Sequence, residues 1–217
     1  MDLAANYRQI TESIRRAADE AQRDPATVQL VAVTKTVPLD ALREAYDLGL
    51  RHFGESKWQE AEPKIAALPA DITWHFIGKL QSNKARKVAE AFQVIHTLET
   101  ESQLKEIAKA SRPIDGLIEI NIAKEIQKSG IFPETLDDFV QSVLYCKNVR
   151  LCGLMTVGPV EVDPERMRGY YKELRGLLAH VPTGSWLSMG MSHDFGVAIQ
   201  EGATHIRVGT ALFGSRS

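Results

Sequence analysis

Short apolar runs alternate with helix-patterned segments along most of the chain. The apolar runs cover Gln29–Thr34, His52–Gly54, Trp74–Gly78, Val94–Leu98, Leu117–Ile122, Leu151–Val157, Trp186–Met191 and Ile206–Phe213. The helical patterns between them cover Leu39–Leu48, Lys57–Leu68, Lys84–Ala91, Glu101–Ala110, Pro133–Tyr145, Pro164–Ala179 and His193–Gln200. Because the runs are mostly apolar through their length, they predict strands of a parallel sheet that is covered on both faces.

The number of predicted strands indicates how the sheet closes. Eight parallel strands separated by helices are typical of a (β/α)8 barrel. A doubly wound open sheet usually has fewer strands and a glycine-rich loop after the first one, but here that strand continues into Thr34-Lys35-Thr36. Since no linker or internal repeat divides the chain, we expect a single domain over residues 1–217, folded as a TIM-type barrel.

A further helix is predicted before the first strand. Its apolar positions recur every three or four residues and end near Asp24-Pro25; they are Leu3, Tyr7, Ile10, Ile14 and Ala17. The α/β barrel is therefore expected to be preceded by an N-terminal helix.

Composition narrows the possible partners and locations. Of the 217 residues, 44% are hydrophobic and 25% charged, which allows a sizeable core. A formal net charge of -2 gives no basic excess for a nucleic-acid partner. The two cysteines and six histidines lack the spacing of a disulfide framework or a metal site. No signal peptide and no apolar run near the ~20 residues of a membrane helix occur, so we expect a cytoplasmic protein.

Lys35 directly follows the first predicted strand, where a β/α barrel places its chemistry. An ammonium at the end of an apolar strand must reach solvent, find an anion or lose its proton. Desolvation would make the amine nucleophilic toward carbonyl groups, as a Schiff-base lysine requires. The alternative is a lysine whose ammonium simply reaches solvent at the barrel rim.

The last predicted strand indicates an anion site. Arg207 lies in an otherwise apolar run, where an unpaired guanidinium would be costly, so we expect it to meet an anion or a strong acceptor. Gly209 lets an oxyanion approach the backbone amides, and Thr210 adds a hydroxyl donor. Barrels often bind phosphate after their seventh and eighth strands.

Ser192 follows the seventh predicted strand and precedes a predicted helix that begins near His193-Asp194. It is expected to be the N-cap residue, and the amides of that helix could bind an anion. Simple capping without a ligand remains the alternative. Together with Gly209-Thr210, Ser192 favours a phosphate site.

Four other positions carry weaker signals. His75 is predicted to be a hydrogen-bonded core histidine, and Cys152 a small core residue. Asn121 could line the pocket or cap a turn, and Met155-Thr156, at the end of the sixth predicted strand, could have no role beyond packing.

Several ordered motifs together resemble those of the pyridoxal-phosphate homeostasis proteins, small relatives of the N-terminal barrel of alanine racemase. The resemblance extends from Leu30 to Phe213. Its motifs are Val31-Ala32-Val33-Thr34-Lys35, Phe53-Gly54-Glu55, the segment from Trp74 to Lys84, Gly153-Leu154-Met155, Leu187-Ser188-Met189-Gly190-Met191-Ser192 with Asp194, and Arg207-Val208-Gly209-Thr210.

The resemblance implies a cofactor, pyridoxal 5'-phosphate (PLP), and a role for each matching residue. It implies that Lys35 forms a Schiff base with PLP. It further implies that Ser192, Gly209 and Thr210 hold the phosphate, that Arg207 faces the pyridine nitrogen, and that the protein is a monomer.

Two more cofactor contacts are implied. Met191 would contribute backbone near the phosphate. The family usually has Gly-Glu-Asn after the second strand, but this chain has Gly54-Glu55-Ser56. Ser56 could keep a hydrogen bond to the cofactor with a shorter reach, so the affinity for PLP is expected to differ.

The sequence favours a binding protein over an enzyme. A permanently charged Arg207 donates to an unprotonated ring nitrogen, which makes PLP a weaker electron sink. The resembling racemases also need a second domain and a partner subunit for an opposing base. We therefore expect a PLP-binding protein for vitamin B6 and amino-acid homeostasis. The alternatives are a racemase-like PLP enzyme and a Schiff-base aldolase that needs no cofactor.

Overall fold

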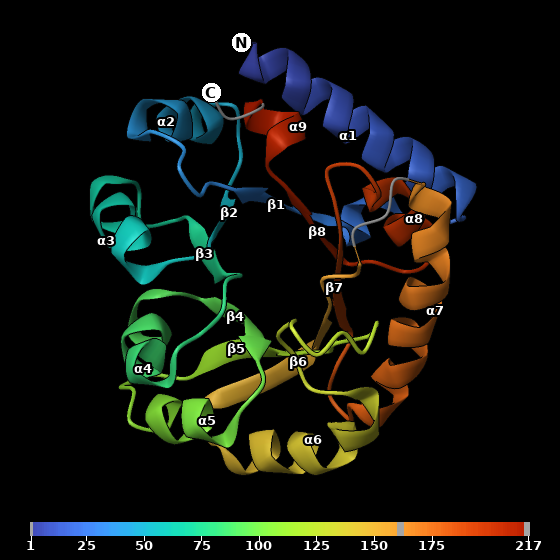
Figure 1. The fold of residues 1–217 in the computed structure, drawn as a ribbon. Helices are drawn as coiled ribbons and strands as arrows, with labels where there is room; N and C mark the ends of the chain where they lie inside the picture. The colour runs from blue at the N-terminus through green and yellow to red at the C-terminus, as the bar shows by residue number, and fades with distance from the viewer. Residues whose placement is uncertain (1, 160–162, 215–217) are drawn as a thin grey trace.

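The computed structural model describes residues 2–159 and 163–214, and within them eight parallel strands close into a barrel in chain order (Figure 1). The strands are β1 (Gln29–Val33), β2 (His52–Glu55), β3 (Thr73–Phe76), β4 (Val94–Leu98), β5 (Ile114–Glu119), β6 (Val149–Met155), β7 (Trp186–Met191) and β8 (His205–Val208). Pairing of β1 with β8 completes the closure. The predicted (β/α)8 barrel is confirmed.

Helices surround the barrel on its outer side (Figure 1). They are α1 (Leu3–Glu20), η1 (Pro25–Thr27), α2 (Leu39–Asp47), α3 (Trp58–Ala67), α4 (Ser82–Ala91), α5 (Glu101–Ile107), η2 (Pro133–Thr135), α6 (Leu136–Tyr145), η3 (Pro164–Met167), α7 (Arg168–Leu177), η4 (Leu178–His180), α8 (Phe195–Gln200) and α9 (Thr210–Phe213). The predicted N-terminal helix is α1, which packs against α8 and α9. In the described residues, no helix is long and apolar enough to span a membrane.

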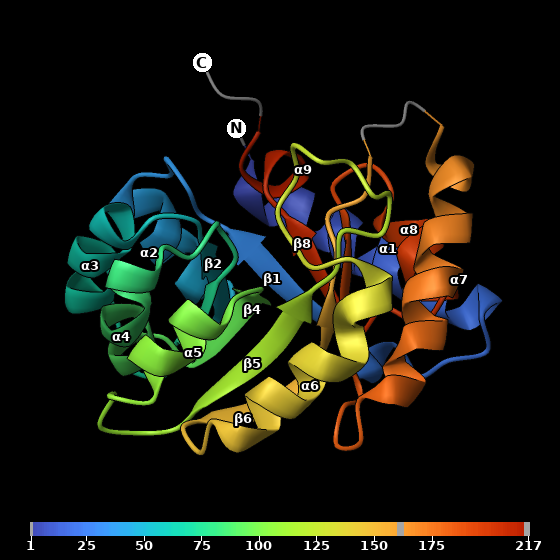
Figure 2. The same cartoon turned by 60° about the horizontal axis from the view of Figure 1, so that its bottom comes forward.

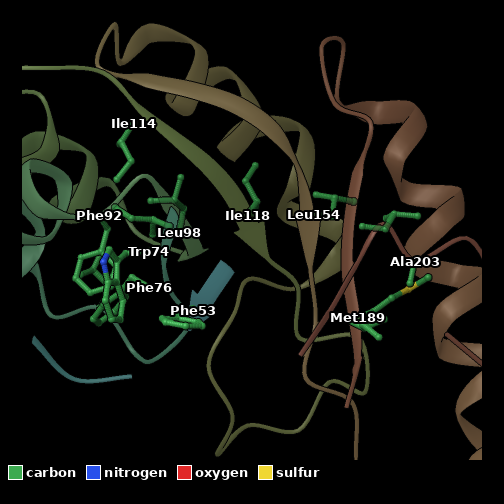
Figure 3. Packing of buried hydrophobic residues seen from close by; sticks show 14 of the residues in the cluster. Phe53, Trp74, Phe76, Phe92, Leu98, Ile114, Ile118, Leu154, Met189 and Ala203 are labelled. Carbon is green, nitrogen blue, oxygen red and sulfur yellow. The ribbon is translucent and has the colours of Figure 1, made fainter. Parts of the chain in front are cut away.

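The layer between strands and helices is apolar because alternate strand residues point outward into it. Phe53 of β2 and Trp74 of β3 meet edge to face with ring centroids 5.6 Å apart. Phe76 and Phe92 make a second such pair at 5.4 Å, beside the first (Figure 3). This layer, which we call the outer core, holds most of the buried apolar side chains.

The barrel interior has a different composition. One side holds a small separate apolar cluster of Val94, Leu117 and Met155, with Trp186 packed against it. The remaining inward positions include polar side chains on five strands: His52, His75, His96, Ser188, His205 and Arg207. Burial of so many polar groups requires them to bond to one another.

The last predicted strand is only partly correct. The sequence predicts a strand over Ile206–Phe213, but β8 ends at Val208 and α9 begins at Thr210. An apolar run of this length fits either a strand or a helix. Here the contact with α1 favours a helix for the second half of the run. Leu212 is buried and its carbonyl accepts a hydrogen bond from Asn6 Nδ2 of α1 at 2.9 Å.

The helix after β7 begins later than predicted. The sequence predicts it from His193 with Ser192 as the N-cap, but α8 begins at Phe195 with Asp194 in the N-cap position. Ser192 is therefore not the N-cap, and its hydroxyl is available to the neighbouring β8–α9 turn. The predicted single domain over residues 1–217 stays a prediction, and residues 1, 160–162 and 215–217 lie outside the described chain.

Candidate functional site

A cavity of about 630 Å³ opens at the carboxyl ends of β1, β7 and β8. Figure 2 shows α9 and the segment after β5 on this side of the barrel. The cavity brings together six of the seven predicted site residues, which come from distant parts of the chain: Lys35, Met191, Ser192, Arg207, Gly209 and Thr210. Its volume lies in the range that small-molecule ligands occupy.

Lys35 is partly buried and is preceded by a firmly held residue. Thr34 is fully buried, and its hydroxyl donates to Glu55 Oε1 at 2.6 Å. Lys64 Nζ of α3 donates to the Thr34 carbonyl at 2.8 Å and to Glu55 Oε1 at 2.7 Å. This buried ion pair fixes the end of β1 from outside, while the next residue along the chain, Lys35, lines the cavity.

Backbone amides at the start of α9 gather around the Ser192 hydroxyl. Ser192 Oγ accepts from the N–H of Gly209 at 3.3 Å and from the N–H of Ala211 at 3.4 Å. Both bonds are long, so they are weak. Amides and hydroxyls converging at one point can bind the oxygens of a phosphate.

The turn that carries Met191 and Ser192 is held by hydrogen bonds to Asp194. Asp194 Oδ1 accepts from the Met191 amide at 2.6 Å, and Asp194 Oδ2 accepts from the Tyr171 hydroxyl of α7 at 2.7 Å. Gly190 has a φ of +92°, and a Cβ there would lie 2.5 Å from the Ala198 side chain. The turn therefore has little freedom to move.

Arg207 is 5% exposed and projects into the barrel interior. Nη1 donates to Ser188 Oγ at 2.6 Å, and Nη2 donates to the Thr156 carbonyl at 2.8 Å. Burial lowers the pKa of the guanidinium, while Tyr171 and Glu119 act in the opposite direction. Arg207 thus meets strong acceptors, as the sequence predicted, and remains a cation because its ordinary pKa is so high.

Glu119 ends β5 close enough to Arg207 to interact electrostatically. Burial, and then the nearby charge of Glu99, raise the pKa of this carboxyl to about 7. Its Oε2 is buried without a hydrogen-bond partner among the described residues. Sequence analysis missed Glu119; a carboxylate inside the apolar run Leu117–Ile122 was the available signal.

Ser56 is the predicted site residue that does not line the cavity. It follows β2, and its carbonyl lies so close to Gly78 that a Cβ on that glycine would be 2.1 Å away. Its contact with a cofactor stays a prediction. Asn121 caps a turn, since its side chain bonds to the backbone N–H and carbonyl of Glu125.

His75 is a hydrogen-bonded core histidine, as predicted, with 1% exposure. It bonds to His52 and His96 on the neighbouring strands, at 2.9 Å in each case. Sequence analysis missed these two partners and Ser188. The available signal was a polar residue recurring once per strand in otherwise apolar runs.

The chain resembles proteins of one kind over nearly its full length. A family model described as the N-terminal domain of alanine racemase matches residues 5–217. The chain is 43% identical to the pyridoxal phosphate homeostasis protein of Pseudomonas aeruginosa, across 99% of this chain and 96% of that protein. It is 39% identical to the protein of the same name from Aquifex aeolicus, across 100% and 99%.

The chain is also similar to a solved structure over nearly its full length. PipY of Synechococcus elongatus, with PLP bound, has 36% identity and a TM-score of 0.79, across 93% of this chain and 100% of that one. Fold and family model together define a barrel of the alanine racemase N-terminal type. Within that class, the chain belongs to the pyridoxal phosphate homeostasis protein family.

Proposed function

We propose that this protein binds PLP in the cavity at the carboxyl ends of the strands and holds it as a Schiff base on Lys35. The observation that carries the proposal is the convergence of an amine, a buried cation and a group of amide donors on one cavity. A related structure contains PLP, and the relatives are named for its homeostasis.

The residues of the cavity fit the chemical groups of PLP. The amides of Gly209 and Ala211, with the hydroxyls of Ser192 and Thr210, suit the phosphate. When bound, the cofactor supplies an aldehyde that condenses with an amine, and a ring that withdraws electrons. Lys35 and Arg207 both line the cavity, where the Lys35 amine would be the nucleophile and Arg207 would donate to the ring nitrogen.

We propose a role in vitamin B6 and amino-acid homeostasis rather than in turnover. Arg207 keeps its protons, so a ring nitrogen that bonds to it stays unprotonated and withdraws electrons less strongly. The cytoplasmic location, the monomeric state and the absence of nucleic-acid partners stay predictions.

Absorbance and borohydride trapping test the binding proposal. Purified protein loaded with PLP should absorb in the visible range, and borohydride should leave a pyridoxyl group on Lys35 in peptide mass maps. Lys35→Ala should lose both signals. Lys147→Ala is the matched control, since Lys147 is an exposed lysine just before β6, at the amino end of the strands, and should keep them.

Other results would contradict the proposal. Protein that stays colourless and unlabelled with added PLP would overturn it, as would an adduct on another lysine. Trapping only with a sugar phosphate would indicate the aldolase alternative. A racemisation rate above that of free PLP, lost in Lys35→Ala, would instead indicate an enzyme.

A further inference from the structure

A continuous row of hydrogen bonds crosses the barrel interior and ends at Arg207. Arg207 Nη1 donates to Ser188 Oγ at 2.6 Å, and Ser188 Oγ lies 2.8 Å from His96 Nδ1. His96 Nε2 is 2.9 Å from His75 Nδ1, and His75 Nε2 is 2.9 Å from His52 Nδ1. We call His52, His75, His96 and Ser188 the interior relay.

Together with Arg207, the relay extends from the cavity at the carboxyl ends of the strands to the opposite end of the barrel. Ser188 and His96 are fully buried, and His75 is 1% exposed. His52 is half-buried and lines a second cavity of about 750 Å³ at the opposite mouth, together with His75 and His205. The residues come from β2, β3, β4 and β7, so only barrel closure brings them into line.

The histidines of the relay are neutral near pH 7. Burial lowers the pKa of His75 and His96 well below its ordinary value, and it lowers the pKa of His52 as well. A neutral imidazole has one N–H donor and one acceptor nitrogen. In each N···N hydrogen bond one nitrogen must therefore donate and the other accept. The tautomer of one ring then determines the tautomer of the next ring.

Arg207 sets the direction of the whole relay. Ser188 Oγ accepts from Arg207, and among the described residues its other side-chain partner is His96. The hydroxyl proton then has His96 Nδ1 as its acceptor. It follows that His96 donates from Nε2 to His75, and that His75 donates from Nε2 to His52. In the reverse direction the Ser188 proton would lack this acceptor, and a buried donor without a partner is unfavourable.

This direction stabilises the buried cation. Each group turns its acceptor toward Arg207 and its donor away, so the bond dipoles are aligned and reinforce one another. Among the described residues no carboxylate lies within ion-pair distance of Arg207; Glu119, Asp194 and Tyr171 act on it from farther away. His205 faces the same interior, but its Nδ1 bonds to Thr204 Oγ1 instead.

We propose that His52, His75 and His96 are positioning residues for Arg207: acting through Ser188, they fix and polarise the guanidinium that donates to the cofactor's ring nitrogen. The effect of the relay on the cofactor rests on the proposed PLP site. The directions of the hydrogen bonds in the relay do not, because they are a property of the ligand-free protein. The two parts can therefore be tested separately.

Nitrogen-15 NMR of the ligand-free wild-type protein tests the arrangement. Two-bond proton–nitrogen spectra at pH 7 should find His75 and His96 neutral, each with its proton on Nε2. A proton on Nδ1 of either ring, or a charged ring, would overturn the proposal. This measurement needs no variant, so a failure of folding cannot obscure it.

Variants test the effect on the cofactor. His96→Leu removes both hydrogen bonds of the ring, and should shift the visible absorption maximum of bound PLP and weaken its binding about tenfold. The control is His180→Gln, which alters an exposed histidine of η4 outside the barrel interior and should leave both values unchanged. Equal spectra and affinities for the two variants would overturn the inference. Wild-type protein that does not bind PLP would contradict the proposed function alone.

Discussion

The outer core and the interior of the barrel are built from the same strands but by opposite rules. Phe53 of β2 points outward, is fully buried and packs against Trp74. Its neighbour His52 points inward and bonds to His75. In the outer core any apolar side chain of suitable volume can contribute. In the interior each polar group needs one particular partner, because an unpaired buried donor or acceptor is costly.

The difference indicates where function-specific residues lie. The outer core stabilises the fold, and its contacts would suit a barrel of any function. The interior carries Arg207, the relay and Glu119. Burial of these polar groups costs stability, so we expect them to serve the site at the carboxyl ends of the strands. Substitutions in the outer core should therefore change mainly the stability of the fold, whereas substitutions in the interior should also change cofactor binding.

The largest effect is expected in the outer core. Phe53→Ala removes a fully buried ring from its contact with Trp74 and should lower the free energy of unfolding by about 3–5 kcal/mol in urea titrations. PLP binding per folded molecule should not change. Tyr145→Ala, at a side chain that is 85% exposed, is the control and should stay within about 0.5 kcal/mol. A loss of cofactor affinity in folded Phe53→Ala would contradict this separation.

The next effect concerns the buried carboxyl of the interior. Because the pKa of Glu119 is about 7 when folded and 4.5 otherwise, the folded protein keeps a proton that the unfolded chain releases. Stability contributed by this group therefore falls as the pH rises from 4.5 to 7. Glu119→Gln should raise the free energy of unfolding by about 3 kcal/mol at pH 8 and change it little at pH 4.

Urea titrations at both pH values measure this difference. Glu62→Gln, on the exposed side of α3, is the matched control and should show no such dependence. The same change for Glu119→Gln at pH 4 and at pH 8 would refute the assigned pKa.

The last effect concerns a buried histidine of the interior; it is of similar size to that of Glu119 and has the opposite sign. Burial lowers the pKa of His205 from 6.5 to about 4, so the unfolded chain takes up a proton that the folded protein excludes. Stability is therefore lost as the pH falls from 6.5 toward 4, by about 1.4 kcal/mol per pH unit for this group. His205→Gln should remove that slope, whereas His180→Gln at the exposed end of η4 should keep it. Parallel pH profiles for the two variants would be the contrary result.

Local patterns in the chain were sufficient to predict the fold and the two charged residues, Lys35 and Arg207, that line the cavity. The alternation of apolar runs with amphipathic helices predicted the closed barrel, because these periodicities reflect which faces are buried. Lys35 and Arg207 stood out because a charge at the end of an apolar strand, or inside one, needs a partner. Whether these residues contact PLP stays a prediction until it is measured.

Tertiary contacts decided the rest. The segment Ile206–Phe213 is apolar enough for one long strand, but its second half forms α9, which packs against α1 and accepts a hydrogen bond from Asn6 at the Leu212 carbonyl. Ser192 was expected to cap a helix, and instead its hydroxyl accepts amide bonds from the β8–α9 turn. The relay joins residues from four strands, which meet only when the barrel closes. Sequence periodicity records which faces are buried, but it carries no information about which buried polar groups will be neighbours.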